Sequence, residues 1–118
     1  MEYRNFGPAG VKVSPIALGL GFRGQADEKE AERVIVHAID SGINLIDCAN
    51  VYGLTDDPDP GAIRSETILG RALQGRRDDV VITSKVTSPI GPGPNDYSSS
   101  RYHIMREVER TLQRLDTD

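Results

Sequence analysis

The sequence predicts an α/β fold in which helices cover a parallel sheet. Three apolar, strand-like runs lie at residues 16–20, 43–48 and 80–85, and each precedes a segment with helical periodicity. Strands that alternate with helices require a parallel sheet with right-handed crossovers. The chain has 118 residues, which is enough for one domain at most.

The composition narrows the class of protein. Hydrophobic residues make up 37% and charged residues 27% of the chain, an ordinary globular balance. The formal net charge of -4 argues against nucleic-acid binding, and the chain has no apolar run long enough to span a bilayer. The first residues lack the pattern of a signal peptide, and the single cysteine, Cys48, lies in an apolar run. We therefore expect a cytoplasmic protein with a reduced, buried thiol.

The first 20 residues predict a hairpin and a strand. Residues 3–6 and 11–13 are strand-like, and the turn-forming residues 7–10 separate them. Residues 16–20 follow as a short buried strand. The glycine-containing loop 21–25 comes next, and its glycines could permit close approach to a ligand or simply make a turn.

The first helix is predicted to begin near Asp27, because Asp27 and Glu30 have the spacing of a capping box. Gly42 suits the left-handed residue that closes a helix. One apolar stripe at helical spacing contains Ala31, Val34, Ile35, Ala38 and Ile39.

A second helix is predicted over residues 64–73, ending at Gly75. Its expected inner face contains Ile68, Leu69, Ala72 and Leu73. The acidic loop 54–61 precedes this helix, and it lacks the ligand spacing and glycine of a calcium loop, so we expect no metal there.

A third helix is predicted after the long loop 87–96, with Ser98 to Ser100 as possible caps. Loops of that length in compact domains often contribute to a site. The expected inner face of this helix contains Ile104, Met105, Val108, Leu112 and Leu115.

Three polar side chains come at the carboxyl ends of the apolar runs, where ligands of parallel α/β sheets bind. Asp47 and Lys85 end the second and third runs, and Tyr52 follows in the loop after the second. A nearby ammonium stabilises a phenolate, and a carboxylate would hold the lysine charged. The three residues could therefore donate a proton to an alkoxide that develops from a carbonyl.

A structural interpretation of the same residues is also open. Asp47 and Lys85 could form an ordinary ion pair between neighbouring strands, with Tyr52 as a packing residue. His37 and His103 fall within predicted helices, where we interpret them as surface or packing residues.

The sequence resembles the aldo-keto reductase family through nearly its whole length. The segments that carry the resemblance are YRNFG at residues 3–7, KVSP at 12–15, DCANVYG at 47–53, SETILGRAL at 65–73, VVITSKV at 80–86 and ERTLQRL at 109–115. Their order and spacing are specific to the family. By this resemblance, residues 1–118 form the N-terminal part of an aldo-keto reductase domain.

The resemblance implies a (β/α)8 barrel closed at the bottom by the hairpin, and NADPH-dependent reduction of aldehydes or ketones, with NADH also possible. It implies that Tyr52 is the general acid, that Lys85 tunes it and that Asp47 pairs with the lysine. It also implies that Gly19, Leu20 and Gly21 lie near the nicotinamide, with Asp47 beside it. Leu20 stands where members often have Thr, and Cys48 replaces a common Thr. The small-molecule carbonyl substrate is not specified, and no metal is implied.

One departure concerns the rest of the barrel. The family's catalytic histidine follows the fourth strand, just beyond Asp118, and His103 does not match it. A full barrel needs about 250 residues. We therefore expect the chain alone to be inactive and its open sheet edge to favour self-association. The alternatives are a non-catalytic binding or regulatory protein and a partial barrel that a partner chain completes.

Overall fold

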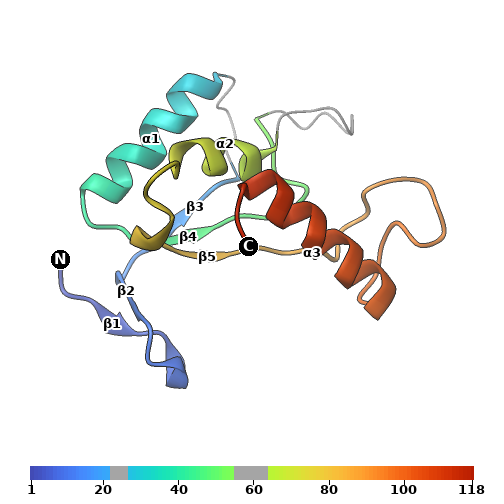
Figure 1. The fold of residues 1–118 in the computed structure, drawn as a ribbon, viewed down its shortest axis with the longest axis horizontal. Coiled ribbons are helices and arrows are strands. Elements are labelled where there is room, and N and C mark those ends of the chain that lie inside the picture. The colour runs from blue at the N-terminus through green and yellow to red at the C-terminus, as the bar shows by residue number, and fades with distance from the viewer. Residues whose placement is uncertain (22–26, 55–63) are drawn as a thin grey trace.

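The computed structural model describes residues 1–21, 27–54 and 64–118. Its elements follow the predicted order of a hairpin and then three strand-and-helix units (Figure 1). The glycine-containing loop from residue 22 and the acidic loop from residue 55 lie outside the described residues, so the two interpretations of these loops stay predictions.

The predicted hairpin is confirmed. Strand β1 (Arg4–Asn5) pairs antiparallel with β2 (Lys12–Val13) across a 3-10 turn at Gly7–Ala9. Gly10 follows the turn with a φ of +72°, a conformation that side chains other than glycine rarely adopt.

Reciprocal hydrogen bonds attach the hairpin to the start of the second sheet strand. The Ser14 amide donates to Asn44 Oδ1 at 2.7 Å, and the Asn44 amide donates to Ser14 Oγ at 3.2 Å. Because Asn44 directly precedes β4 (Leu45–Asp47), the hairpin lies at the amino end of the sheet. The carboxyl ends of the strands point away from it.

The sheet is parallel, with the order β3 (Leu18–Gly19), β4 and β5 (Val81–Thr83). Each strand is shorter than the apolar run that predicted it. Across the sheet, Leu18, Ile46 and Ile82 are register partners, and so are Gly19, Asp47 and Thr83. Since successive side chains point to opposite faces, Ile46 and Asp47 belong to different sides of the sheet.

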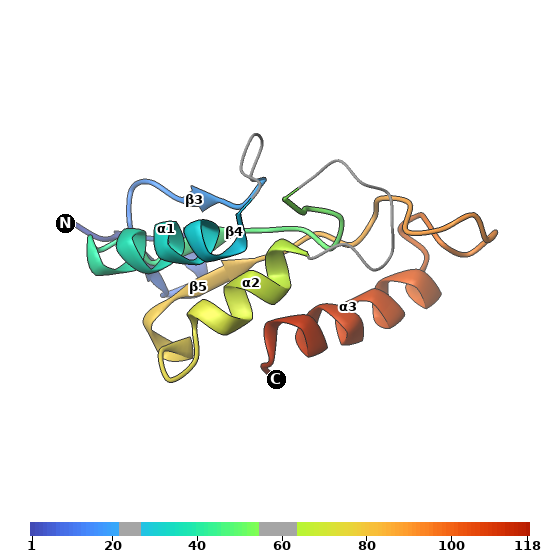
Figure 2. The same cartoon turned by 90° about the horizontal axis from the view of Figure 1, so that it is seen from above.

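The three helices of the described residues are α1 (Glu28–Asp40), α2 (Ser65–Ala72) and α3 (Arg101–Leu115). They lie on one side of this sheet, with α1 and α2 over the strands and α3 beside α2 (Figures 1 and 2). Helix α2 lies between the other two and contacts both. Ile46 is fully buried on the helix-covered face, whereas Asp47 keeps its side chain 38% exposed on the other.

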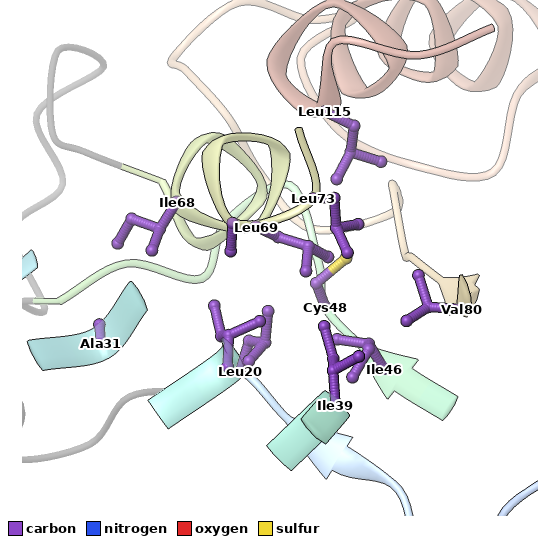
Figure 3. Close-up of a cluster of buried hydrophobic side chains, with 12 residues drawn as sticks. Leu20, Ala31, Ile39, Ile46, Cys48, Ile68, Leu69, Leu73, Val80 and Leu115 are labelled. Carbon is purple, nitrogen blue, oxygen red and sulfur yellow. The ribbon is translucent and has the colours of Figure 1, made fainter. Parts of the chain in front are cut away.

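The core lies between α2 and the strands (Figure 3). Ile68 and Leu69 of α2 are buried against Leu20 and Ile46 of the strand segments, as Figure 3 shows. Fully burying one such side chain contributes roughly 1.5–3 kcal/mol to the stability of the fold.

Helix α1 begins and ends as predicted. The Asp27 carboxylate accepts from the Glu30 amide at 2.9 Å, and Gly42 closes the helix with a φ of +93°. The predicted stripe is buried except for Val34, which is 42% exposed.

The prediction for the inner face of α3 was wrong. Met105 and Val108 are 48% and 37% exposed, and of the predicted residues only Leu115 is fully buried. The residues that α3 buries are His103, Glu107, Thr111 and Leu115.

The physical reason is that α2 presents a polar, closely approaching surface to α3. Arg114 Nε donates to the buried Glu66 Oε2 at 2.6 Å. Gly70 lies so close that a Cβ built on it would be 2.7 Å from the Leu115 carbonyl oxygen. Polar residues of α3 therefore face α2, and Met105 and Val108 of its apolar stripe are exposed.

Within the three described ranges, no helix has both the length and the apolar character needed to cross a membrane.

Candidate active site

Asp47 and Lys85, predicted to act together, form an ion pair at the carboxyl ends of β4 and β5. Lys85 Nζ donates to Asp47 Oδ2 at 2.7 Å and to the Cys48 carbonyl oxygen at 2.8 Å. Asp47 and Lys85 meet because their strands are adjacent and both side chains lie on the face that the helices leave free.

Each member of the ion pair shifts the pKa of the other. The hydrogen bond from Lys85 lowers the pKa of Asp47 against the opposing effect of burial, and a hydrogen bond from Thr83 lowers it further. Burial disfavours the charge on Lys85, but the hydrogen bond and charge of Asp47, together with Tyr52, hold the pKa of Lys85 above its ordinary value. Both groups are therefore charged at neutral pH.

Tyr52 lies next to this pair. Lys85 Nζ is 5.0 Å from the centroid of the Tyr52 ring. The backbone of Tyr52 is fixed on both sides, since its amide donates to the Ala49 carbonyl at 3.1 Å and its carbonyl accepts from the Ser65 amide at 2.9 Å. The structure thus brings Asp47, Tyr52 and Lys85 together.

The end of β3 borders the same place. Gly19 is the register partner of Asp47, and a Cβ built on Gly19 or Gly21 would have no described atom within 4 Å. Leu20 points the other way and is fully buried in the hydrophobic core. Only its backbone can line the site.

Thr83 is a site residue that sequence reasoning missed. Its hydroxyl donates to Asp47 Oδ1 at 2.7 Å. The sequence shows that Thr83 stands two residues before Lys85 and therefore on the same face of its strand, but it does not show that Thr83 lies opposite Asp47.

A second set of polar contacts attaches the backbone around the site to the helices. Ser84 Oγ donates to the buried Glu66 at 2.5 Å. Asn50, in the turn before Tyr52, donates from its amide to the Lys85 carbonyl at 3.0 Å and from Nδ2 to the buried Glu107 at 3.3 Å. These contacts join the turn and the end of β5 to α2 and α3.

The remaining reactive side chains have structural positions. His37 is exposed on α1, and the buried His103 ring contacts the carbonyl oxygens of Asn95 and Val86 at 3.1 and 2.6 Å. Cys48 is fully buried, as predicted, and burial raises the pKa of its thiol to about 11. Among the described residues, no group of His, Cys, Asp and Glu side chains could hold a metal ion.

The chain is similar to known proteins both in sequence and in fold. A model of the aldo/keto reductase family matches residues 15–118. A protein of Bacillus subtilis described as "Uncharacterized oxidoreductase YrpG" is 41% identical over 126 residues, covering 100% of this chain and 37% of its own length. A "Probable voltage-gated potassium channel subunit beta" of Arabidopsis thaliana is 39% identical over 123 residues, covering 100% of this chain and 35% of its own length.

A similar solved structure is the crystal structure of a Pseudomonas aeruginosa protein assigned as an aldo-keto reductase. Its sequence is 41% identical to this chain, and its fold matches with a TM-score of 0.79 over 98% of this chain and 43% of its own length. The chain therefore spans well under half the length of the proteins that it matches.

Proposed function

The chain belongs to the aldo/keto reductase family, and from this premise we propose that it supplies the proton-donating part of an NAD(P)H-dependent reductase of aldehydes or ketones. Its three units are the open-sheet portion of a (β/α)8 barrel. The observation that carries the proposal is the Asp47–Lys85 ion pair with its ammonium 5.0 Å from the Tyr52 ring.

In the proposed reaction, Tyr52 gives its phenolic proton to the carbonyl oxygen as that oxygen gains negative charge. A free tyrosine has a pKa of about 10 and is a weak acid at neutral pH. The Lys85 ammonium stabilises the phenolate that remains, which makes the transfer easier. Asp47 keeps Lys85 charged and holds its ammonium in place.

When bound, the nicotinamide supplies the hydride that goes to the carbonyl carbon. The open backbone at Gly19 and Gly21, with Leu20 between them, would line its ring beside Asp47. NADPH is the proposed cofactor, with NADH as the variant to compare, and no metal is part of the proposal. A small carbonyl compound is the proposed substrate, and a cytoplasmic location fits both.

The direct test of the proposed function is a chimeric enzyme. Residues 1–118 replace the matching segment of a full-length family member with measurable carbonyl-dependent NADPH oxidation, for which the Pseudomonas protein is a natural first scaffold. We expect Tyr52→Phe to lower kcat by about 10²- to 10⁴-fold, the usual contribution of a general acid. Tyr3→Phe, the same change in the hairpin, is the matched control and should leave kcat unchanged. A graft that keeps its rate without the Tyr52 hydroxyl would refute the proposal.

The isolated chain should neither bind NADPH tightly nor turn over, because the implied histidine and cofactor-phosphate segments are not among its residues. Titration of the 118-residue chain with NADPH checks this. Saturable binding in the micromolar range would contradict the expectation.

A second proposed function is a non-catalytic binding or regulatory role, which the name of the Arabidopsis relative favours. A partial barrel completed by a partner chain is the remaining possibility. Mixing the chain with a C-terminal fragment of a family member and assaying carbonyl-dependent NADPH oxidation separates the two, since only the completed barrel gains activity.

A further inference from the structure

Resting on the proposed function, we propose that Thr83 is a positioning residue of the site. Its hydroxyl donates a hydrogen bond to one carboxylate oxygen of Asp47, so that the other oxygen faces Lys85. Thr83 itself would not touch the substrate, and it would act on Tyr52 only through these two charged side chains.

The geometry divides the Asp47 carboxylate between two partners. Thr83 Oγ1 donates to Oδ1 at 2.7 Å, and Lys85 Nζ donates to Oδ2 at 2.7 Å. Asp47 and Thr83 are register partners on adjacent strands, so their backbones are already held opposite each other. Both contacts have the short distances of hydrogen bonds to a charged acceptor.

This site needs such a constraint because its charged side chains are accessible to water. The side chains of Asp47 and Lys85 are 38% and 48% exposed. An exposed ion pair is weak and its geometry is loosely held, since both side chains lose rotational freedom to form it. Thr83 is stiff at χ1 because it is β-branched, and it therefore offers a fixed donor to one oxygen.

The constraint extends to the ammonium. With Oδ2 held in place, Lys85 Nζ has two fixed acceptors, Asp47 Oδ2 and the Cys48 carbonyl oxygen at 2.8 Å. These two contacts set the position of the ammonium beside the Tyr52 ring. Without the Thr83 hydroxyl, the Asp47 carboxylate can rotate and the ammonium can move with it.

The variants are chosen to separate positioning from stability. Thr83→Val keeps the shape and removes the donor, whereas Thr83→Ser keeps the donor. Thr111→Val is the matched control, because Thr111 is buried on α3 and accepts from Arg114 Nη2 at 3.3 Å, away from the ion pair. It should affect folding stability and leave the site unchanged.

The first readout needs no catalysis. Carbon NMR of the 118-residue chain follows the titration of the Asp47 carboxyl. We expect its pKa to rise in Thr83→Val, since a hydrogen bond to the charged form lowers a pKa, and to stay in place in Thr83→Ser and Thr111→Val. An unchanged pKa in Thr83→Val, or an equal rise in Thr111→Val, would overturn the inference.

The second readout uses the grafted reductase. Thr83→Val should lower kcat about tenfold with little change in KM. This is the low end of the loss expected when a hydrogen-bond partner that orients a functional side chain is removed. Thr83→Ser should recover the rate. Unaltered kcat in Thr83→Val would overturn the positioning role, whereas a Tyr52→Phe graft that stays active would overturn the proposed function and leave the NMR result standing.

Discussion

Helices α1 and α3 pack on opposite sides of α2, but they do so through different chemistry. The contact of α1 buries small and branched apolar side chains, including Ala31 and Ile35, and its one described ion pair, Arg71–Glu28, is partly exposed. The contact of α3 uses the Glu66–Arg114 ion pair and a close backbone approach at Gly70. The apolar stripe of a helix therefore marks its buried face only where the neighbouring helix is also apolar.

The two contacts differ in what they require of their residues. Apolar packing is non-directional, so α1 tolerates changes of shape that conserve volume. A buried charge must keep its partner, because an unpaired carboxylate out of water is strongly disfavoured. We expect the α3 contact to be the less tolerant of the two, and the following changes measure the difference.

The largest effect is expected from Arg114→Met. Among the described residues, this change leaves the fully buried Glu66 with the Ser84 hydroxyl as its one side-chain partner. Breaking a buried pair in this way costs about 3–5 kcal/mol. Urea unfolding of the 118-residue chain measures the loss.

A double variant sharpens that result. Adding Glu66→Gln to Arg114→Met removes the stranded charge, so part of the lost stability should return. If the double variant is no more stable than Arg114→Met alone, the charge of Glu66 is not the cause.

The next largest effect is expected from Gly70→Ala. The added Cβ would lie 2.7 Å from the Leu115 carbonyl oxygen and 2.8 Å from that of Arg114, and neither backbone atom can move freely. In an exposed helix the change would stabilise by about 1 kcal/mol, but overpacking costs about 1–3 kcal/mol. We expect net destabilisation by thermal unfolding. Gly21→Ala, which meets no described atom within 4 Å, is the control.

A smaller effect is expected on the α1 side. Ile35→Val removes one buried methylene from the apolar contact and should cost about 0.5–1.5 kcal/mol. The loss should be smaller than the loss in Arg114→Met, because no charge is left unpaired. Equal losses of the two variants in urea unfolding would contradict the contrast.

The smallest effect on stability is expected from lowering the pH. The Gly93 amide and then the Arg106 guanidinium hold the pKa of Asp96 below its ordinary value, at the entrance to α3. A depressed pKa gives stability that is present above the ordinary value of about 3.9 and is lost as the pH falls through the folded value. Hydrogen exchange should therefore speed up near the start of α3 before it does in α1. Asp96→Asn should abolish this difference.

The order of elements and the helix starts were predictable from the sequence, because caps and apolar periodicity are local. Asp27 caps α1 and Ser100 caps α3 through contacts three residues away. The buried face of α3 was not predictable, because it depends on Glu66, which lies 48 residues from Arg114.

The candidate site also has a part that the sequence predicts and a part that it does not. Asp47 and Lys85 were predicted as neighbours because parallel strands align their carboxyl ends. The contribution of Thr83 was not, since it depends on the register between β4 and β5, which a single sequence does not specify.

The spatial order of the strands is also their order along the chain, and each of the two helix contacts joins consecutive helices. During translation, each nascent unit can dock on the one made just before it, without waiting for a distant segment. The hairpin is attached at Asn44, directly before β4, so its contact with the sheet joins segments from the first half of the chain. A protein built in this way can grow strand by strand from its amino end.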